Sequence, residues 1–195
     1  MDALEALLTR RSVRAYTDEP VSDDQVLKIL AAGMQAPSAN NQQPWHFVVL
    51  RQREHLDGLA EVLEFGKMLR QAPLGIVVCA DVGREQHAGY WVQDCAAATQ
   101  NILLACHALG LGAVWIGVYP RDERVLALRE LLGLPATVTP LCVIAIGRPA
   151  EHPAPTAPVT FTAIRIIRST RLLRTDCGAG PTVGCRLLFC KREVV

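Results

Sequence analysis

The sequence contains a short segment whose residue types could bind an anion. Residues 10–14 read Arg-Arg-Ser-Val-Arg, so three guanidinium groups and one hydroxyl fall within five positions. Arginine presents a planar fork of N–H donors that matches phosphate oxygens. The segment is therefore a candidate anion site, and from spacing alone a solvated basic turn after a helix is an equally open interpretation.

A second segment could recognise a planar ring. Residues 37–45 read Pro-Ser-Ala-Asn-Asn-Gln-Gln-Pro-Trp, which places four consecutive amide side chains between two prolines. Amides offer both donors and acceptors, as the edge of a heteroaromatic ring requires. The alternative is a polar surface loop. Trp45 is expected to fill the core and not to stack on a ligand.

Hydrophobic periodicity and turn residues predict the elements that must position these segments. A capping box over residues 22–25 predicts a helix that ends before Pro37. The other expected helices cover residues 2–9, 53–64, 88–109 and 122–132, and the expected strands cover 46–50, 74–80, 113–118 and 138–146. The helix over 88–109 is rich in alanine and poor in charge, which predicts burial and a close neighbour.

Composition excludes several classes of protein. The chain has 195 residues, of which 50% are hydrophobic and 20% are charged, with 20 basic and 19 acidic side chains. This balance gives no basis for nucleic-acid or membrane-surface binding. No apolar run approaches the roughly 20 residues of a membrane span. The acidic N-terminus lacks the pattern of a secretory signal, so we expect a cytoplasmic protein.

Cysteine and histidine spacing offers no metal site. The seven cysteines include no Cys-x-x-Cys pair, and the five histidines are scattered. We therefore expect buried free thiols and no bound metal. The sequence also lacks a nucleotide phosphate loop, a nucleophile elbow and a zinc protease motif. Gly110 and Gly112 are interpreted as a helix stop.

Several segments together resemble the nitroreductase family of flavin-dependent oxidoreductases. The similarity extends over residues 4–150, in the family's order and spacing. It is carried by residues 10–14, 36–45, 110–117 and 131–135, and by Trp91, Asp94, Ala97, Ala98 and Asn101 of the long helix.

The resemblance implies an α+β fold with a central mixed β-sheet flanked by helices, an intertwined homodimer, and FMN at the dimer interface. It implies that Arg10, Arg11, Ser12 and Arg14 hold the phosphate, ribityl chain and pyrimidine edge of FMN. The partner subunit would contribute the amide loop, with Pro37, Ser38, Ala39, Asn41 and Gln43 as its binding residues. Ile116 and Gly117 would line the ring near N5.

The implied activity is transfer of hydride from NAD(P)H through flavin N5 to a nitroaromatic, quinone or similar small acceptor in a ping-pong cycle. Because the flavin carries the chemistry, no catalytic side chain is assigned. Two alternatives remain open: a non-catalytic flavin-binding protein, and a specialised branch that performs flavin fragmentation or reductive dehalogenation. Residues 64–72 lie where a lid is expected.

The charge distribution changes near residue 150. Residues 1–150 hold 13 basic and 16 acidic residues, whereas residues 151–195 hold 7 basic and 3 acidic residues. Members of the family usually end in a basic, aromatic segment that reaches the partner subunit, and residues 151–195 do not match it. We predict an FMN-binding domain over 1–150 and a divergent basic, cysteine-containing tail over 151–195, with Arg165 or Arg168 as a substitute phosphate ligand.

Overall fold

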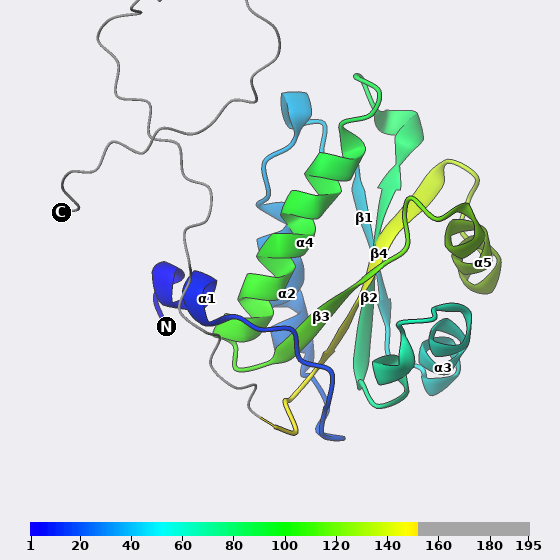
Figure 1. Ribbon diagram of the computed structural model, residues 1–195. Coiled ribbons are helices and arrows are strands. Elements are labelled where there is room, and N and C mark those ends of the chain that lie inside the picture. Colours follow the sequence, from blue (N-terminus) through cyan, green and yellow to red (C-terminus); the bar gives the residue numbers. More distant parts are fainter. Residues whose placement is uncertain (152–195) are drawn as a thin grey trace, which may run out of the picture. The chain divides into compact units, whose positions relative to one another are not determined.

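The computed structural model describes residues 1–151 (Figure 1). The helices are α1 (Ala3–Thr9), α2 (Asp23–Met34), α3 (Arg53–Val62), α4 (Trp91–Ala108) and α5 (Asp122–Leu132), and the strands are β1 (Trp45–Leu50), β2 (Leu74–Asp81), β3 (Gly112–Gly117) and β4 (Val138–Gly147). Three short 3₁₀ turns are η1 (Ala39–Asn41), η2 (Lys67–Arg70) and η3 (Val82–Arg84). Residues 152–195 of the predicted tail, with Arg165 and Arg168, lie outside the described residues.

The four strands form one sheet in the order β1-β2-β4-β3, and each neighbouring pair is antiparallel. Within residues 1–151, the parallel component of the expected mixed sheet is limited to an isolated bridge between Ser12 and Ala113. That bridge joins the N-terminal segment to β3, the edge strand. The topology thus holds the basic segment along one edge of the sheet.

Helices cover both faces of the sheet. In Figure 1, α2 and α4 lie on one side of the strands, and α3 and α5 lie on the other. Ile76 packs in the core cluster that contains α2 and α4, whereas its neighbour Val77 packs in the cluster that contains α3 and α5. Both side chains are fully buried. This two-sided burial explains the nearly continuous apolar runs of β2 and β4.

The helix boundaries follow local capping chemistry. The predicted capping box is present at the start of α2, where the Ser22 and Gln25 side chains each pair with the other's backbone. Gly133 ends α5 in the left-handed conformation at φ 61°. The helix predicted to start at residue 88 begins instead at Trp91. The reason is that the Glu85 carboxylate accepts hydrogen bonds from Gly89 N and Trp91 N, at 3.3 and 2.8 Å, and closes the preceding turn.

The four cysteines within residues 1–151 are buried and free, as predicted: Cys79, Cys95, Cys106 and Cys142. Burial raises the pKa of the Cys79, Cys106 and Cys142 thiols to about 12. Since the thiolate is the reactive form, these residues act as core side chains. No helix in this part of the chain is long and apolar enough to span a bilayer. No cluster of metal-ligating side chains occurs in it either.

Candidate functional site

The basic N-terminal segment runs in extended form along the edge of β3. Val13 N donates a hydrogen bond to the Ala113 carbonyl at 3.1 Å, and Thr17 N donates to the Arg148 carbonyl at 2.9 Å. The buried Tyr16 hydroxyl lies 2.6 Å from the Val13 carbonyl oxygen and 3.1 Å from that of Ala145. The chain is therefore fixed to the sheet at Val13 and again at Thr17, and Arg14 lies between these two anchors.

Gly112 permits this close approach. A Cβ atom at Gly112 would lie 2.6 Å from Cγ1 and 2.7 Å from Cβ of Val13. Contacts this short do not occur in folded proteins, so any larger residue would force the two segments apart. The glycine that the sequence presents as a helix stop is thus also a packing requirement of the basic segment.

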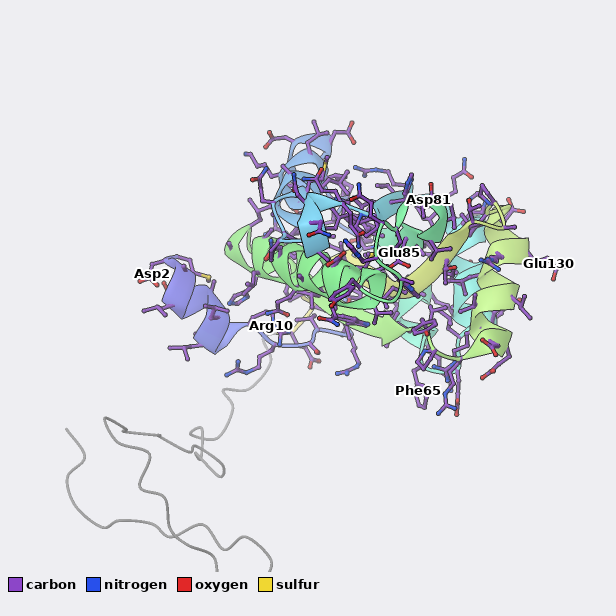
Figure 2. The ribbon with its side chains drawn as sticks, turned by 90° about the horizontal axis from the view of Figure 1, so that it is seen from above. Asp2, Arg10, Phe65, Asp81, Glu85 and Glu130 are labelled. Atoms are coloured by element: carbon purple, nitrogen blue, oxygen red, sulfur yellow. The ribbon has the colours of Figure 1, made fainter. Side chains whose placement is uncertain are left out.

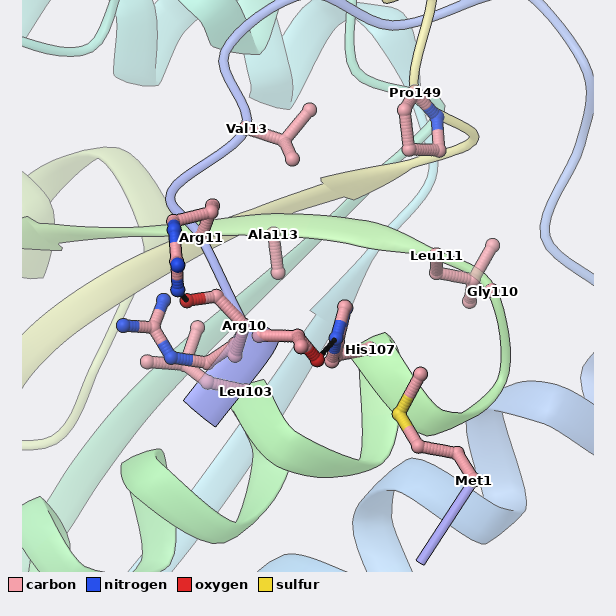
Figure 3. Close-up of a pocket in the computed structure, with 11 residues that line it drawn as sticks. Met1, Arg10, Arg11, Val13, Leu103, His107, Gly110, Leu111, Ala113 and Pro149 are labelled. Carbon is pink, nitrogen blue, oxygen red and sulfur yellow. Dashed lines mark hydrogen bonds between the residues drawn. The ribbon is translucent and has the colours of Figure 1, made fainter. Parts of the chain in front are cut away.

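Arg10, Arg11 and His107 line a first hollow of about 310 Å³ between the N-terminal segment and the C-terminal end of α4 (Figure 3). The Arg11 guanidinium donates to the carbonyl oxygens of Leu8 and Arg10, at 3.0 and 2.8 Å. The Thr9 hydroxyl donates to the Glu5 carbonyl at 2.6 Å and lies 2.8 Å from His107 Nε2. Since the hydroxyl proton is already committed, His107 Nε2–H is the donor in that contact.

Two guanidinium groups and one carboxylate act on the charge of His107. Partial burial, followed by the charges of Arg10 and Arg11, lowers the pKa of His107 below its ordinary value, while Glu5 opposes the shift. None of the ion pairs within residues 1–151 involves Arg10. This end of the segment therefore favours an anion.

Arg14 and Ile116, which the sequence places in one binding site, line a second hollow of about 540 Å³. Lys67 lies at the same hollow, and neither cation takes part in the ion pairs within residues 1–151. Phe65 and Trp115 supply exposed aromatic surface. Glu64 also lines the hollow, but the two cations beside aromatic rings fit a planar ligand that carries negative charge, and FMN is a ligand of this kind.

The amide loop is shaped by a buried carboxylate. Asp94, which is 4% exposed, accepts hydrogen bonds from Ala39 N at 3.0 Å and from Gln42 Nε2 at 2.9 Å. The Ser38 hydroxyl accepts from Gln43 N at 3.0 Å. Asn40, Asn41 and Gln43 have positive φ angles. Together these contacts hold Pro37, Asn41 and Gln43 exposed at one end of the molecule.

The amide loop and the Arg10–Arg11 end of the basic segment lie at opposite ends of α4. Asp94 contacts the loop near the start of that helix, whereas His107 lies beside Arg10 near its end. At about 1.5 Å per residue, these two side chains are on the order of 20 Å apart along the axis. One chain brings Arg14 together with Ile116, but it does not bring the amide loop to Arg10 and Arg11.

Sequence reasoning did not include several residues that line or support the site. Phe65 and Lys67 fall in the segment expected to be a lid, and Trp115 directly precedes Ile116. Arg124, on α5, donates from Nη1 to the Gly117 carbonyl at 3.1 Å. Phe65 is a large apolar side chain on the surface, and such exposure can mark a binding site. The sequence alone does not show that Phe65 is exposed.

Comparison with known proteins now decides the family. The model of the nitroreductase family matches residues 7–65 and 61–148, which include the basic segment, the amide loop and β3. The chain belongs to the nitroreductase family. The predicted resemblance is therefore confirmed, and the predicted α+β fold is that of its solved relatives.

Three of these nitroreductase relatives are informative. A Methanothermobacter thermautotrophicus protein, provisionally named NADH dehydrogenase/NAD(P)H nitroreductase, is 52% identical over 153 residues, covering 78% of this chain and 80% of that protein. The Bacillus subtilis FMN reductase [NAD(P)H] is 31% identical over 171 residues, covering 78% and 68%. A provisionally assigned nitroreductase from Desulfovibrio desulfuricans, solved in complex with FMN, is 38% identical with a TM-score of 0.71, covering 82% and 93%.

Proposed function

We propose that this nitroreductase-family chain passes hydride from NAD(P)H to a nitroaromatic, quinone or similar acceptor in a ping-pong cycle. Its assignment as an FMN-dependent oxidoreductase rests on the family match and on relatives named for NAD(P)H and FMN. When bound, FMN would supply the redox chemistry, which is hydride transfer from NAD(P)H through its N5 atom to the acceptor. The observation that carries the proposal is the second hollow, where Arg14, Lys67 and Ile116 meet aromatic side chains.

The residues that would hold FMN divide into three groups. Arg10, Arg11, Ser12 and Arg14 would bind its phosphate, ribityl chain and pyrimidine edge, because Arg10 and Arg14 have no carboxylate partner within residues 1–151. Ile116 and Gly117 would lie along the ring at the end of β3. The third group is the amide loop with Pro37, Ser38, Ala39, Asn41 and Gln43.

We propose that the amide loop comes from a second copy of the chain. Its separation from Arg10 and Arg11, by the length of α4 between Asp94 and His107, supports an arrangement in which each site takes its arginines from one subunit and its loop from the other. A homodimer supplies two such sites by symmetry. The remaining partner would be a small-molecule electron acceptor.

The first test is spectroscopic. The purified full chain, loaded with FMN, should show a flavin absorption spectrum that bleaches when NADPH or NADH is added without oxygen. Addition of a nitroaromatic or a quinone should then restore it. A flavin spectrum that neither pyridine nucleotide bleaches would contradict the oxidoreductase and favour a flavin-binding role. Turnover with products of flavin cleavage or dehalogenation would assign a specialised branch instead.

His107 offers a test of where the FMN phosphate lies. Burial, and after it the charges of Arg10 and Arg11, lowers the pKa of His107, and a phosphate bound against the two arginines would oppose their charge. We expect the pKa of His107, measured by NMR titration, to be higher in the FMN-loaded protein than in the riboflavin-loaded protein. Riboflavin is the matched control because it lacks only the phosphate.

The assignment of the His107 resonance is made with the His107→Asn variant. An identical His107 titration with both flavins would place the phosphate elsewhere. A rise in the FMN form alone would locate it at Arg10 and Arg11.

A further inference from the structure

One guanidinium on α5 ties together two segments that border the second hollow. Arg124 Nη1 donates to the Gly117 carbonyl at 3.1 Å, and its Nη2 lies 3.5 Å from Glu64 Oε2. Its Cζ atom lies 5.7 Å from the centre of the Phe65 ring, within the range of a cation–π contact. The Arg124 side chain is 21% exposed, although Phe65 and Glu64 lie on the surface.

The contacted groups belong to two segments that are far apart in the sequence. Glu64 and Phe65 precede the η2 turn, whereas Gly117 ends β3 directly after Ile116. Figure 2 shows Phe65 projecting at the edge of the molecule. An exposed phenyl ring loses conformational freedom only if something holds it. Within residues 1–151, the Arg124 guanidinium makes a cation–π contact with this ring.

We propose that Arg124 is a positioning residue that holds Phe65 at the mouth of the second hollow, and that Phe65 sets the preference of the enzyme for planar aromatic acceptors. The proposal rests on the proposed function, because it needs a flavin and an acceptor at that hollow. Phe65 would stack on the ring of the acceptor, where offset aromatic pairs are favourable. A non-aromatic acceptor would gain nothing from the contact.

Acceptor kinetics give the first measurement. In a ping-pong cycle, kcat/KM for the acceptor reports only the half-reaction in which the acceptor is reduced. We expect Phe65→Ala and Arg124→Met to lower kcat/KM for a nitroaromatic by about tenfold, as the loss of one aromatic or cation–π contact allows. For ferricyanide, a non-aromatic acceptor, kcat/KM of both variants should stay within about twofold of the wild-type value. Arg124→Lys keeps the charge but not the planar fork, so it should recover part of the loss.

Hydrogen exchange gives a second measurement that does not depend on activity. In Arg124→Met, the peptide covering residues 63–68 should exchange several-fold faster than in the wild-type protein, because its anchor is lost. The matched control is Arg121→Met, at the start of the same helix. Arg121 is exposed, and its side chain makes none of the hydrogen bonds or ion pairs within residues 1–151.

The two measurements separate the possible failures. Unchanged exchange in Arg124→Met would overturn the positioning role, whatever the activity. Faster exchange with an unchanged ratio of nitroaromatic to ferricyanide kcat/KM would overturn the role of Phe65 in acceptor preference. A wild-type protein that reduces no acceptor would overturn the proposed function and the acceptor preference that rests on it, while hydrogen exchange would still decide whether Arg124 anchors the segment.

Discussion

The Gly112→Ala variant should lose both stability and flavin. The added methyl would sit 2.6 Å from Val13 Cγ1, so the N-terminal segment must move away from β3. That movement breaks the hydrogen bond from Val13 N to the Ala113 carbonyl and the bridge at Ser12. Overpacking of this kind costs about 1–3 kcal/mol. We expect the free energy of unfolding, measured in urea, to fall by about 2 kcal/mol.

The variant should also bind FMN more weakly, because the arginines proposed to hold FMN belong to the segment that is displaced. We expect the dissociation constant of FMN to rise by at least about tenfold, measured by the quenching of flavin fluorescence. Gly117→Ala is the matched stability control on the same strand, because a Cβ there meets no atom within 4 Å.

The cause can be isolated by a second substitution. Val13→Ala removes the two methyl groups nearest to the new atom but leaves Cβ, which lies 2.7 Å from it. The double variant Gly112→Ala with Val13→Ala should therefore lose less unfolding free energy than the sum of the two single losses. It should still be less stable than the wild-type protein. Equal stability of Gly112→Ala and Gly117→Ala would show that the segment does not depend on this contact.

The elements of the fold could be predicted from the sequence because each is encoded locally. The capping box at Ser22, the apolar run of β2 and the glycine that ends α5 all act within a few residues. The pairing of the strands could not be predicted in this way. The β2 and β4 sequences show burial on both faces, but burial does not fix which neighbour is parallel, and the described strands are antiparallel where a mixed sheet was expected.

The candidate site could be predicted only in part, for a similar reason. Residue type and density identified the basic segment and the amide loop, which are continuous in sequence. Contacts between distant segments leave no such pattern. Nothing in the sequence pairs Arg124 with Phe65, or shows that Asp94 shapes the amide loop. The separation of the two motifs likewise depends on which end of α4 each one contacts.

The arrangement proposed for the dimer predicts that two defective chains can restore one site. In the first chain, Arg10→Ala and Arg14→Ala remove the cations, and in the second, Asn41→Gly and Gln43→Gly remove the exposed amides. Glycine suits these two loop positions because Asn41 and Gln43 have φ angles of 53° and 45°. Each variant alone should retain roughly a tenth or less of the wild-type FMN.

The hybrid dimer, co-expressed with two different tags and purified on both, should bind about half of the wild-type FMN, because symmetry gives it one intact site and one doubly damaged site. The flavin content is measured by absorbance against protein concentration, and NAD(P)H oxidation should recover in the same proportion. The two parent dimers, purified in the same way, are the controls. A hybrid with no more flavin than its parents would mean that the arginines and the amide loop serve a site within one chain. In that case the separation of about 20 Å along α4 would have to close by a movement of the loop or of the N-terminal segment.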